Sequence, residues 1–286
     1  MTRNHFEAPG FARNTAHSAA PLVLKLGGRS LDAPAAFASF VLEVAAFART
    51  HPLVLVHGGG AQVSAWSERL GLVPRFEGGL RVTDAETLEV VTAVLAGLSN
   101  KRLVAALRDA GSDAVGLSLL DGGLVPVARH ADSATLGAVG TPIGVHTAWL
   151  SELLGGHRLP VIATLGAQHG ELLNVNADDA AAAIAAALGA DLVLLSDIAG
   201  LTIEGELRSS LDANQARALA DHPQVSGGMR PKLLAAAHAV ATGARSARIA
   251  RWEDAGTLAA LLGSQAPGTC IACAVPPLAH TAGLAR

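Results

Sequence analysis

Short apolar runs and helical stretches alternate along the chain from residue 21 onward, and this alternation constrains the fold more than any other feature. The run at residues 191–196 is almost wholly apolar, as in a buried strand. Strands are predicted at residues 22–27, 53–57, 114–117, 124–128, 160–164, 171–175, 191–196, 246–250 and 269–274, and helices at 34–49, 61–70, 84–110 with an interruption near Gly97, 178–188, 212–221, 231–242 and 254–262. This order predicts an α/β fold, a three-layer αβα sandwich with a mostly parallel central sheet.

Size and charge exclude several classes of protein. The chain has 286 residues, of which 50% are hydrophobic and 16% charged, and these values are typical of a globular protein. A net charge of −3 argues against a nucleic-acid partner. The apolar stretch at residues 180–190 is too short to span a bilayer, and residues 1–20 lack the apolar core of a secretory signal, so we expect a cytosolic protein without a membrane partner. Cys270 and Cys273 lack the further ligands that zinc requires, and we expect both to be buried on the last strand.

Glycine clusters follow the first two predicted strands, at the carboxyl ends where ligands bind in such sheets. Lys25 comes just before Gly27 and Gly28 inside an apolar strand, and burying a lysine is unfavourable unless it meets an anion. The glycines allow backbone N–H groups to approach that anion closely. This segment is consistent with a phosphate site, and equally with a lysine that reaches solvent from the strand end.

The second cluster is His57-Gly58-Gly59-Gly60, which leads into a predicted helix. Free N–H groups at a helix start form a cradle for an oxyanion or a carboxylate. The sequence H-G-G-G also occurs in lipase-like hydrolases, but those enzymes need a G-x-S-x-G turn. This chain contains no such turn, so an anion cradle or a simple tight turn remains.

Arg81 comes just before a helix that Thr83 or Asp84 would cap. Arginine binds a carboxylate through two parallel hydrogen bonds, which makes Arg81 a candidate anion ligand. The alternative is an ordinary exposed arginine.

Two asparagines, Asn174 and Asn176, are expected to point the same way from a strand, where their amides can bind amide and carboxylate groups of a substrate. In the plainer interpretation Asp178 or Asp179 caps the following helix. That interpretation leaves the two asparagines unexplained.

Lys232 lies beside Gly227 and Gly228 in the first turn of a predicted helix. A cation is unfavourable at the positive end of a helix dipole, so Lys232 indicates a nearby anion unless its side chain bends away. The signatures G-x-x-x-x-G-K-[ST], H-R-D and D-F-G are absent. A phosphotransferase without them still needs positioning and charge neutralisation, which two lysines, glycine N–H groups and a metal ion can supply.

Taken together and in order, several segments resemble the acetylglutamate kinases of the amino-acid kinase family, over about Pro21 to Ile271. The matching segments are LVLKLGG, LVLVHGGG, GLRVTD, VLAGLSNKRLV, VGLSLLDGG, LPVIATLG, NVNADDAAAAIAAALGADLVLLSDIAGL and SGGMRPK. The resemblance implies that ATP phosphorylates N-acetyl-L-glutamate, giving ADP and N-acetyl-L-glutamyl 5-phosphate, the second step of arginine biosynthesis. It also implies ATP and Mg²⁺ as cofactors, with the metal held mainly by the ATP phosphates.

Carried over by position, the resemblance also implies roles for single residues. Lys25 and Lys232 would stabilise the transferring phosphoryl group, and Asp178 would hold the two lysines in place. The implied substrate contacts are Gly59, Gly60, Arg81 (on the α-carboxylate), Asn174 and the neighbouring Asn176. The implied phosphate and ATP contacts are Gly27, Gly28, Asp197, Ile198, Ala199, Gly200, Leu201, Thr202, Gln224, Val225 and Ser226.

The chemistry of the acceptor agrees with this set of residues. A carboxylate with an unperturbed pKa of about 4 is already ionised at neutral pH, so it needs no general base. The enzyme must instead overcome the repulsion between an anion and ATP, and preorganised lysines and N–H groups do so. We therefore expect no catalytic histidine and a structural role for His57.

The resemblance further implies two lobes: residues 21–189 bind the acylated amino acid and dimerise, and residues 190–275 bind ATP. Residues 1–20 and 276–286 are expected to be flexible tails. Residues 1–20 show little of the amphipathic pattern of the N-terminal helix that links dimers in arginine-sensitive hexameric members. We therefore expect a homodimer with little feedback inhibition by arginine.

Two alternatives stay open at this stage. One is a sibling kinase that acts on N-succinylglutamate, aminoadipate, glutamate, carbamate or UMP. The other is a non-catalytic sensor of the same fold, although the presence of Lys25, Lys232 and Asp178 argues against it.

Overall fold

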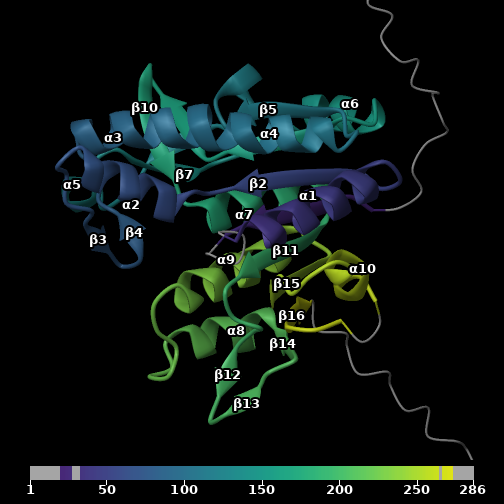
Figure 1. Cartoon of the computed structure of the whole chain (residues 1–286). Coiled ribbons are helices and arrows are strands. Elements are labelled where there is room, and N and C mark those ends of the chain that lie inside the picture. The colour runs from purple at the N-terminus through teal and green to yellow at the C-terminus, as the bar shows by residue number, and fades with distance from the viewer. Residues whose placement is uncertain (1–19, 28–32, 264–265, 273–286) are drawn as a thin grey trace, which may run out of the picture.

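An eight-stranded sheet runs through the whole molecule (Figure 1). The computed structural model describes residues 20–27, 33–263 and 266–272. In order across the sheet, its strands are β14 (Ser210–Asp212), β16 (Thr269–Ala272), β15 (Ser246–Arg251), β11 (Asp191–Ser196), β1 (Leu22–Leu26), β2 (Leu53–His57), β8 (Leu159–Ala163) and β5 (Ala114–Ser118). All neighbouring pairs are parallel except β15 and β16, so the predicted mostly parallel sheet is confirmed.

Strand β1 joins the two halves of this sheet. The strands on one side of it, β2, β8 and β5, come from the N-terminal part of the chain, and those on the other side, from β11 to β14, come from the C-terminal part. The strand order therefore reverses at β1. In open α/β sheets ligands bind beside such a reversal, at the carboxyl ends of the strands, and Lys25 lies near that end of β1.

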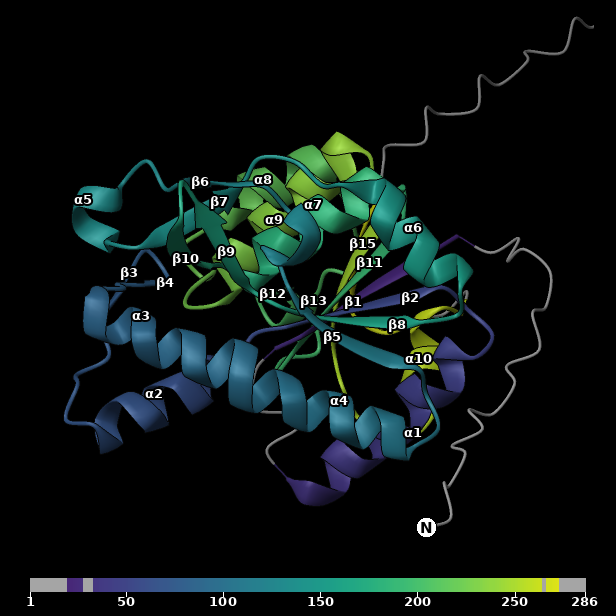
Figure 2. The same ribbon diagram turned by 90° about the horizontal axis from the view of Figure 1, so that it is seen from above.

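Helices cover both faces of the sheet, which confirms the predicted three-layer sandwich (Figure 2). One face is covered by α1, α4 and α10, and the other by α6, α7 and α9. The helices are α1 (Pro34–Ala48), α2 (Gly60–Arg69), α3 (Ala85–Val91), the π-helix η1 (Thr92–Ser99), α4 (Asn100–Asp109), the 3₁₀ turn η2 (Asp121–Gly123), α5 (Ser133–Leu136), α6 (Thr147–Gly155), α7 (Ala177–Leu188), α8 (Ala213–Ala220), α9 (Met229–Thr242) and α10 (Thr257–Leu261).

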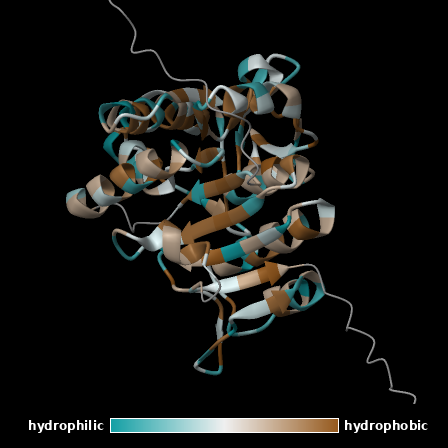
Figure 3. Cartoon of the chain, turned by 90° about the vertical axis from the view of Figure 1, so that its right-hand side faces the viewer, coloured by the Kyte–Doolittle hydropathy of each residue, from teal (hydrophilic) through white to brown (hydrophobic). Residues whose placement is uncertain are grey.

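The central strands of the sheet are mostly hydrophobic (Figure 3). Alternate residues of each of these strands belong to different cores, one on each face of the sheet. On β1, Leu22 and Leu24 pack on the face of α1 and α4, whereas Val23 packs on the face of α7 and α9. Because side chains alternate along a strand, Lys25 shares the face of Val23. The sequence of β1 thus directs its one charged side chain towards α7 and α9.

A second sheet and two hairpins complete the fold. The second sheet has the order β6 (Val127–Arg129), β7 (Val139–Pro142), β10 (Glu171–Val175) and β9 (Leu165–Gln168), and the hairpins are β3 (Phe76–Glu77) with β4 (Leu80–Arg81) and β12 (Thr202–Ile203) with β13 (Glu206–Leu207). Strand β10 leads directly into α7, which places the segment around Asn174 and Asp178 next to the large sheet.

The predicted interruption near Gly97 is wrong. Helical structure runs without a break from Ala85 to Asp109, and Gly97 lies within its π-helical part. A widened turn of this kind absorbs a local irregularity without ending the helix. By length and composition alone this helix could cross a membrane, but its C-terminal part packs on β5 and β8.

Short elements account for most of the other differences. Strand β7, strand β9, both hairpins and helix α6 were not predicted, and the strand expected at residues 124–128 begins only at Val127. Cys270 on β16 is partly exposed rather than buried, and Cys273 lies outside the described residues. The large sheet buries its strands on both faces and so imposes a clear apolar pattern, which these peripheral elements lack.

Candidate active site

Two lysines from opposite halves of the molecule meet on one carboxylate. Lys25 Nζ on β1 lies 2.9 Å from Asp178 Oδ1, and Lys232 Nζ on α9 lies 2.9 Å from Asp178 Oδ2. The Lys25 and Asp178 side chains are only 7% and 6% exposed. The anion that the position of Lys232 indicated is therefore Asp178, in the first turn of α7.

The charges of this cluster do not balance. Burial opposes the negative charge of Asp178, yet Lys25 and Lys232 hold the pKa of its carboxyl below the usual value. Burial lowers the pKa of the Lys25 ammonium, Asp178 opposes that shift, and Lys232 adds to it. When both lysines are protonated, two cations and one anion leave one positive charge in excess at a largely buried place, and such a place favours a further anion.

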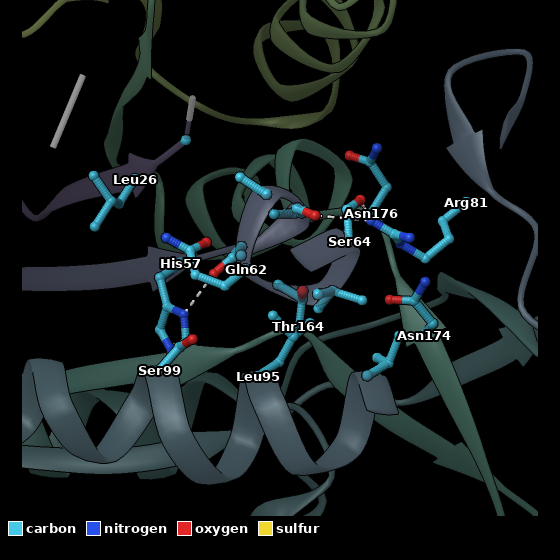
Figure 4. A pocket seen from close by; sticks show the side chains of 18 of the residues that line it. Leu26, His57, Gln62, Ser64, Arg81, Leu95, Ser99, Thr164, Asn174 and Asn176 are labelled. Atoms are coloured by element: carbon cyan, nitrogen blue, oxygen red, sulfur yellow. Dashed lines mark hydrogen bonds between the residues drawn. The ribbon is translucent and has the colours of Figure 1, made fainter. Parts of the chain in front are cut away.

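A cavity of about 910 Å³ opens beside this cluster (Figure 4). In Figure 4, Leu26 and His57 lie on one side of the view and Arg81 and Asn174 on the other. Of the predicted site residues, the cavity is lined by Lys25, Gly27, Gly59, Gly60, Arg81, Asn174, Asn176, Asp178 and Asp197. Residues far apart in the sequence, and predicted from separate motifs, therefore share one cavity.

Arg81 is a buried cation without a charge partner. It is only 8% exposed, and among the described residues no carboxylate lies within ion-pair distance of it. Its Nη2 donates to Gly60 O and to Ser64 Oγ, both at 2.8 Å, whereas Nη1 has no hydrogen-bond partner in the described part of the chain. Burial lowers the pKa of Arg81, so the guanidinium would be stabilised by an anion in the cavity.

A chain of hydrogen bonds orients the amide of Asn174. The Thr83 hydroxyl donates to Arg81 O at 2.9 Å, so its oxygen is left to accept from Asn174 Nδ2 at 3.1 Å. Asn174 Oδ1 is then the atom available to a ligand that donates an N–H. The choice between two helix caps is also settled, because Asp84 rather than Thr83 caps α3 by accepting from the Thr87 N–H.

Asn176 has a different position from the one predicted. It follows the end of β10 and is the N-cap of α7, where its Oδ1 accepts from the N–H groups of Asp178 and Asp179. The plainer interpretation, in which Asp178 or Asp179 caps this helix, is therefore wrong. Asn176 still lines the cavity, but only its Nδ2 remains for a ligand.

Glycines hold the backbone close to the lysine cluster and to the cavity. A Cβ on residue 27 would collide with Lys25 Nζ, so glycine is required there for the lysine to keep its position. Gly59 is the N-cap of α2, and a Cβ on it would collide with the Leu95 side chain. Gly28 lies outside the described residues.

Most of the predicted ATP contacts lie apart from this cavity. Gly27 and Asp197 line the cavity, whereas Ile198 and Ala199, which follow Asp197 in an exposed loop at the carboxyl end of β11, do not. Leu201 is 2% exposed, and its N–H donates to Thr269 Oγ1, so it offers a ligand neither side chain nor N–H. The remaining ones among the described residues, Gly200, Thr202, Gln224, Val225 and Ser226, lie in the same C-terminal half.

Sequence reasoning missed several residues that orient the site. Ser64 accepts a hydrogen bond from Arg81 across 17 positions, and no local pattern indicates that contact. Asn100 is fully buried beside His57. Its position did carry a signal, because Asn100, Leu103 and Leu107 share one face of a helix and the two leucines are core residues.

Comparisons with known proteins place the chain in a family. The model of the amino acid kinase family matches residues 20–251. The chain is 44% identical over 234 residues to the acetylglutamate kinase of Roseiflexus castenholzii (81% of this chain, 90% of that protein) and 40% identical over 259 residues to that of Moritella profunda (89% and 97%). A carbamate kinase from Giardia lamblia bound to AMP-PNP shares the fold, with a TM-score of 0.65 at 15% identity over 90% of this chain and 100% of that one. The chain therefore belongs to the amino acid kinase family, and within it to the acetylglutamate kinases.

Proposed function

We propose that this chain transfers the γ-phosphoryl group of ATP to the side-chain carboxylate of N-acetyl-L-glutamate, giving ADP and N-acetyl-L-glutamyl 5-phosphate in arginine biosynthesis. One observation carries the proposal: the cavity beside the Lys25–Asp178–Lys232 cluster also contains Arg81 with an N–H that no described residue uses. A dicarboxylate such as acetylglutamate has two carboxylates, one for the lysine cluster and one for Arg81. The relatives named acetylglutamate kinase, at 40–44% identity, support the same acceptor.

The reaction needs charge stabilisation rather than proton transfer. An oxygen of the ionised acceptor carboxylate attacks the γ-phosphorus, the bond to the β–γ bridging oxygen breaks, and ADP leaves with that oxygen. Lys25 and Lys232 neutralise the charge that builds up on the phosphoryl oxygens. Asp178 fixes both ammonium groups before the reaction, so no reorganisation is needed at the transition state.

The acceptor is held by groups from the N-terminal half. Arg81 binds the α-carboxylate through its free Nη1, and Asn174 Oδ1 accepts from the N–H of the acetylated amine. The N–H groups of Gly59 and Gly60, at the start of α2, donate to the reacting carboxylate. Asn176 Nδ2 is a further donor at the same cavity.

Mg²⁺ is proposed to arrive with the nucleotide, as MgATP. Among the described residues no group of three His, Cys, Asp or Glu side chains could hold a metal ion. In the proposed complex the phosphates of ATP would carry the metal, which would neutralise part of their charge. We further propose that the nucleotide lies over the loops at residues 197–202 and 224–226, with Gly27 and Gly28 beside its phosphates.

The two halves of the sheet suggest how the chain is organised. We propose that residues 21–189 bind the acceptor and dimerise, and that residues 190–275 bind ATP, in the cytosol. A homodimer is supported by the apolar helix Ala85–Asp109, because only 39% of its most apolar part is buried within the chain. Gel filtration that gives a monomer or a hexamer would contradict the dimer.

Trapping the product tests the reaction and the acceptor together. Hydroxylamine converts an acyl phosphate into an acyl hydroxamate, which we expect only when ATP, Mg²⁺ and N-acetylglutamate are all present. N-Succinylglutamate, aminoadipate and glutamate serve as competing acceptors, and carbamate and UMP are compared by ADP release. Faster turnover with any of these five would overturn the proposed acceptor, and no ADP release with any acceptor, acetylglutamate included, would overturn the enzymatic function.

A further inference from the structure

His57 is buried beside the cavity, although the reaction proposed above requires no histidine. It ends β2 and is 2% exposed. Leu53 and Leu55 belong to the core on the face of α4, and alternation along the strand gives His57 the same direction. There it meets Asn100, the first residue of α4, which is fully buried.

The surroundings of Asn100 determine which way its amide points. Nδ2 lies 2.9 Å from Val161 O, and a backbone carbonyl can only accept a hydrogen bond. Oδ1 accepts from Lys101 Nζ at 3.0 Å. Nδ2 also lies 3.4 Å from Leu117 O and 3.0 Å from His57 Nε2, and because an amide nitrogen only donates, that ring nitrogen is the acceptor.

The contact of the other ring nitrogen, Nδ1, independently indicates the same tautomer of His57. Nδ1 lies 2.8 Å from Gly58 O, again a carbonyl that only accepts, so Nδ1 carries the proton. Burial lowers the pKa of His57, the bond to Gly58 opposes that shift, and Lys101 adds to it. His57 is thus neutral with both nitrogens engaged, and it has none left to act as a base on a substrate.

The hydrogen bond from His57 to Gly58 O also determines the direction of the next N–H group, that of Gly59. Gly58 C=O and Gly59 N–H belong to the same trans peptide group, in which the two bonds point in opposite directions. The imidazole on the carbonyl side therefore turns the Gly59 N–H away from β2 and α4. Within the described part of the chain, no hydrogen bond uses the N–H of Gly59 or Gly60, and both residues line the cavity.

We propose that His57 and Asn100 are positioning residues, which lock the Gly58–Gly59 peptide so that the Gly59 N–H faces the acceptor carboxylate. Asn100 selects the tautomer of His57, and His57 in turn fixes the peptide. The identity of the carboxylate rests on the proposed function, whereas the locked peptide rests only on the contacts above. A flipped peptide would present a carbonyl oxygen to the anion in place of a donor.

Two substitutions of His57 separate positioning from packing. The amide of His57→Asn places an N–H donor where Nδ1 stands, and His57→Gln places its amide near Nε2. We expect His57→Asn to keep kcat/KM for acetylglutamate within about fivefold, and His57→Gln to lower it about 10- to 100-fold, because a preorganised donor is misplaced. The KM for ATP should stay unchanged in both variants. Equal loss in the two variants, or no loss in either, would overturn the proposal.

The tautomer provides a readout that does not depend on activity. In ¹⁵N-labelled wild-type protein, the His57 ring signals, identified by their absence in His57→Asn, should show a neutral ring with the proton on Nδ1. A proton on Nε2, or a charged ring at neutral pH, would refute the arrangement even if the variants fold poorly. A wild-type protein that shows this tautomer but makes no acyl hydroxamate would overturn the proposed acceptor and leave the locked peptide standing.

Discussion

The two halves of this molecule, proposed to bind the acceptor and the nucleotide, differ in how firmly their polar groups are held. In the N-terminal half, Arg81 is 8% exposed and Thr83 is fully buried, and hydrogen bonds orient both side chains. In the C-terminal half, the predicted nucleotide loops are mostly exposed, with Ile198 45% exposed. One side is therefore a preformed cavity, and the other is an open surface.

The proposed function explains this difference by the two ligands. Acetylglutamate is small and flexible, so its reacting oxygen must be placed by several groups that are already rigid. ATP is larger and carries its own charges, so exposed loops can bind it through many weaker contacts. Only the reacting phosphoryl group needs both halves, and there each half contributes one lysine to Asp178.

Removing either lysine should give the largest loss of activity, because each half of the molecule supplies only one lysine to the cluster on Asp178. We expect Lys25→Ala and Lys232→Ala each to lower kcat by about 100-fold or more, the usual effect of losing one preorganised donor. The double variant should be little worse than the single variants, because each loss disrupts the same cluster. Steady-state kinetics measure this, with the exposed Arg217→Ala on α8 as the matched control. Unchanged turnover in Lys232→Ala would remove the role proposed for it.

Arg81→Lys tests whether the acceptor side acts separately. Lysine keeps the charge but loses the planar pair of donors, so we expect KM for acetylglutamate to rise about 10- to 100-fold. The KM for ATP should not change, because the hydrogen bonds and the ring contact of the guanidinium that the described residues show all involve the N-terminal half. A parallel rise in both KM values would show that the two sides are not independent.

The large sheet could be predicted from the sequence more fully than the site. Strands buried on two faces have continuous apolar runs, and the glycines at their ends are enough to locate the cavity. The role of Asn176 could not be predicted in this way, because an asparagine before a helix can equally well cap the helix or bind a ligand. Contacts such as Arg81 with Ser64 depend on how α2 and β4 pack, which no local pattern encodes.

The lysine content of the chain carries a further signal about the site. The chain has only three lysines, Lys25, Lys101 and Lys232, and otherwise relies on arginine for positive charge. Two of them meet on Asp178, and the third contacts Asn100, which orients His57. A rare residue type at a glycine-rich strand end marks a place where the compact ammonium group, not simply a positive charge, is needed.

Asp179 lies at the boundary between the halves and contrasts with its neighbour Asp178. Two lysines compensate Asp178, whereas burial and the charge of Asp178 raise the pKa of Asp179 from 3.8 to about 6. The unfolded chain releases this proton at lower pH than the folded one, so stability falls as pH rises from about 4 to 6. We expect Asp179→Asn to raise the free energy of unfolding by about 1–3 kcal/mol near pH 8 and to change little near pH 4. Urea unfolding across this range measures it, and an equal effect at both ends would contradict the raised pKa.

Gln224→Ala should give the smallest effect and tests the nucleotide side alone. Gln224 Oε1 accepts from the Glu204 N–H at 2.8 Å and so links the loop at residues 224–226 to the turn of the β12–β13 hairpin. An exposed hydrogen bond contributes about 0.5–1 kcal/mol, which corresponds to a two- to fivefold rise in KM for ATP. Because no described contact connects Gln224 to the acceptor cavity, KM for acetylglutamate should stay the same. If the KM for acetylglutamate rises instead, the open surface and the preformed cavity are coupled, and the two sides do not act independently.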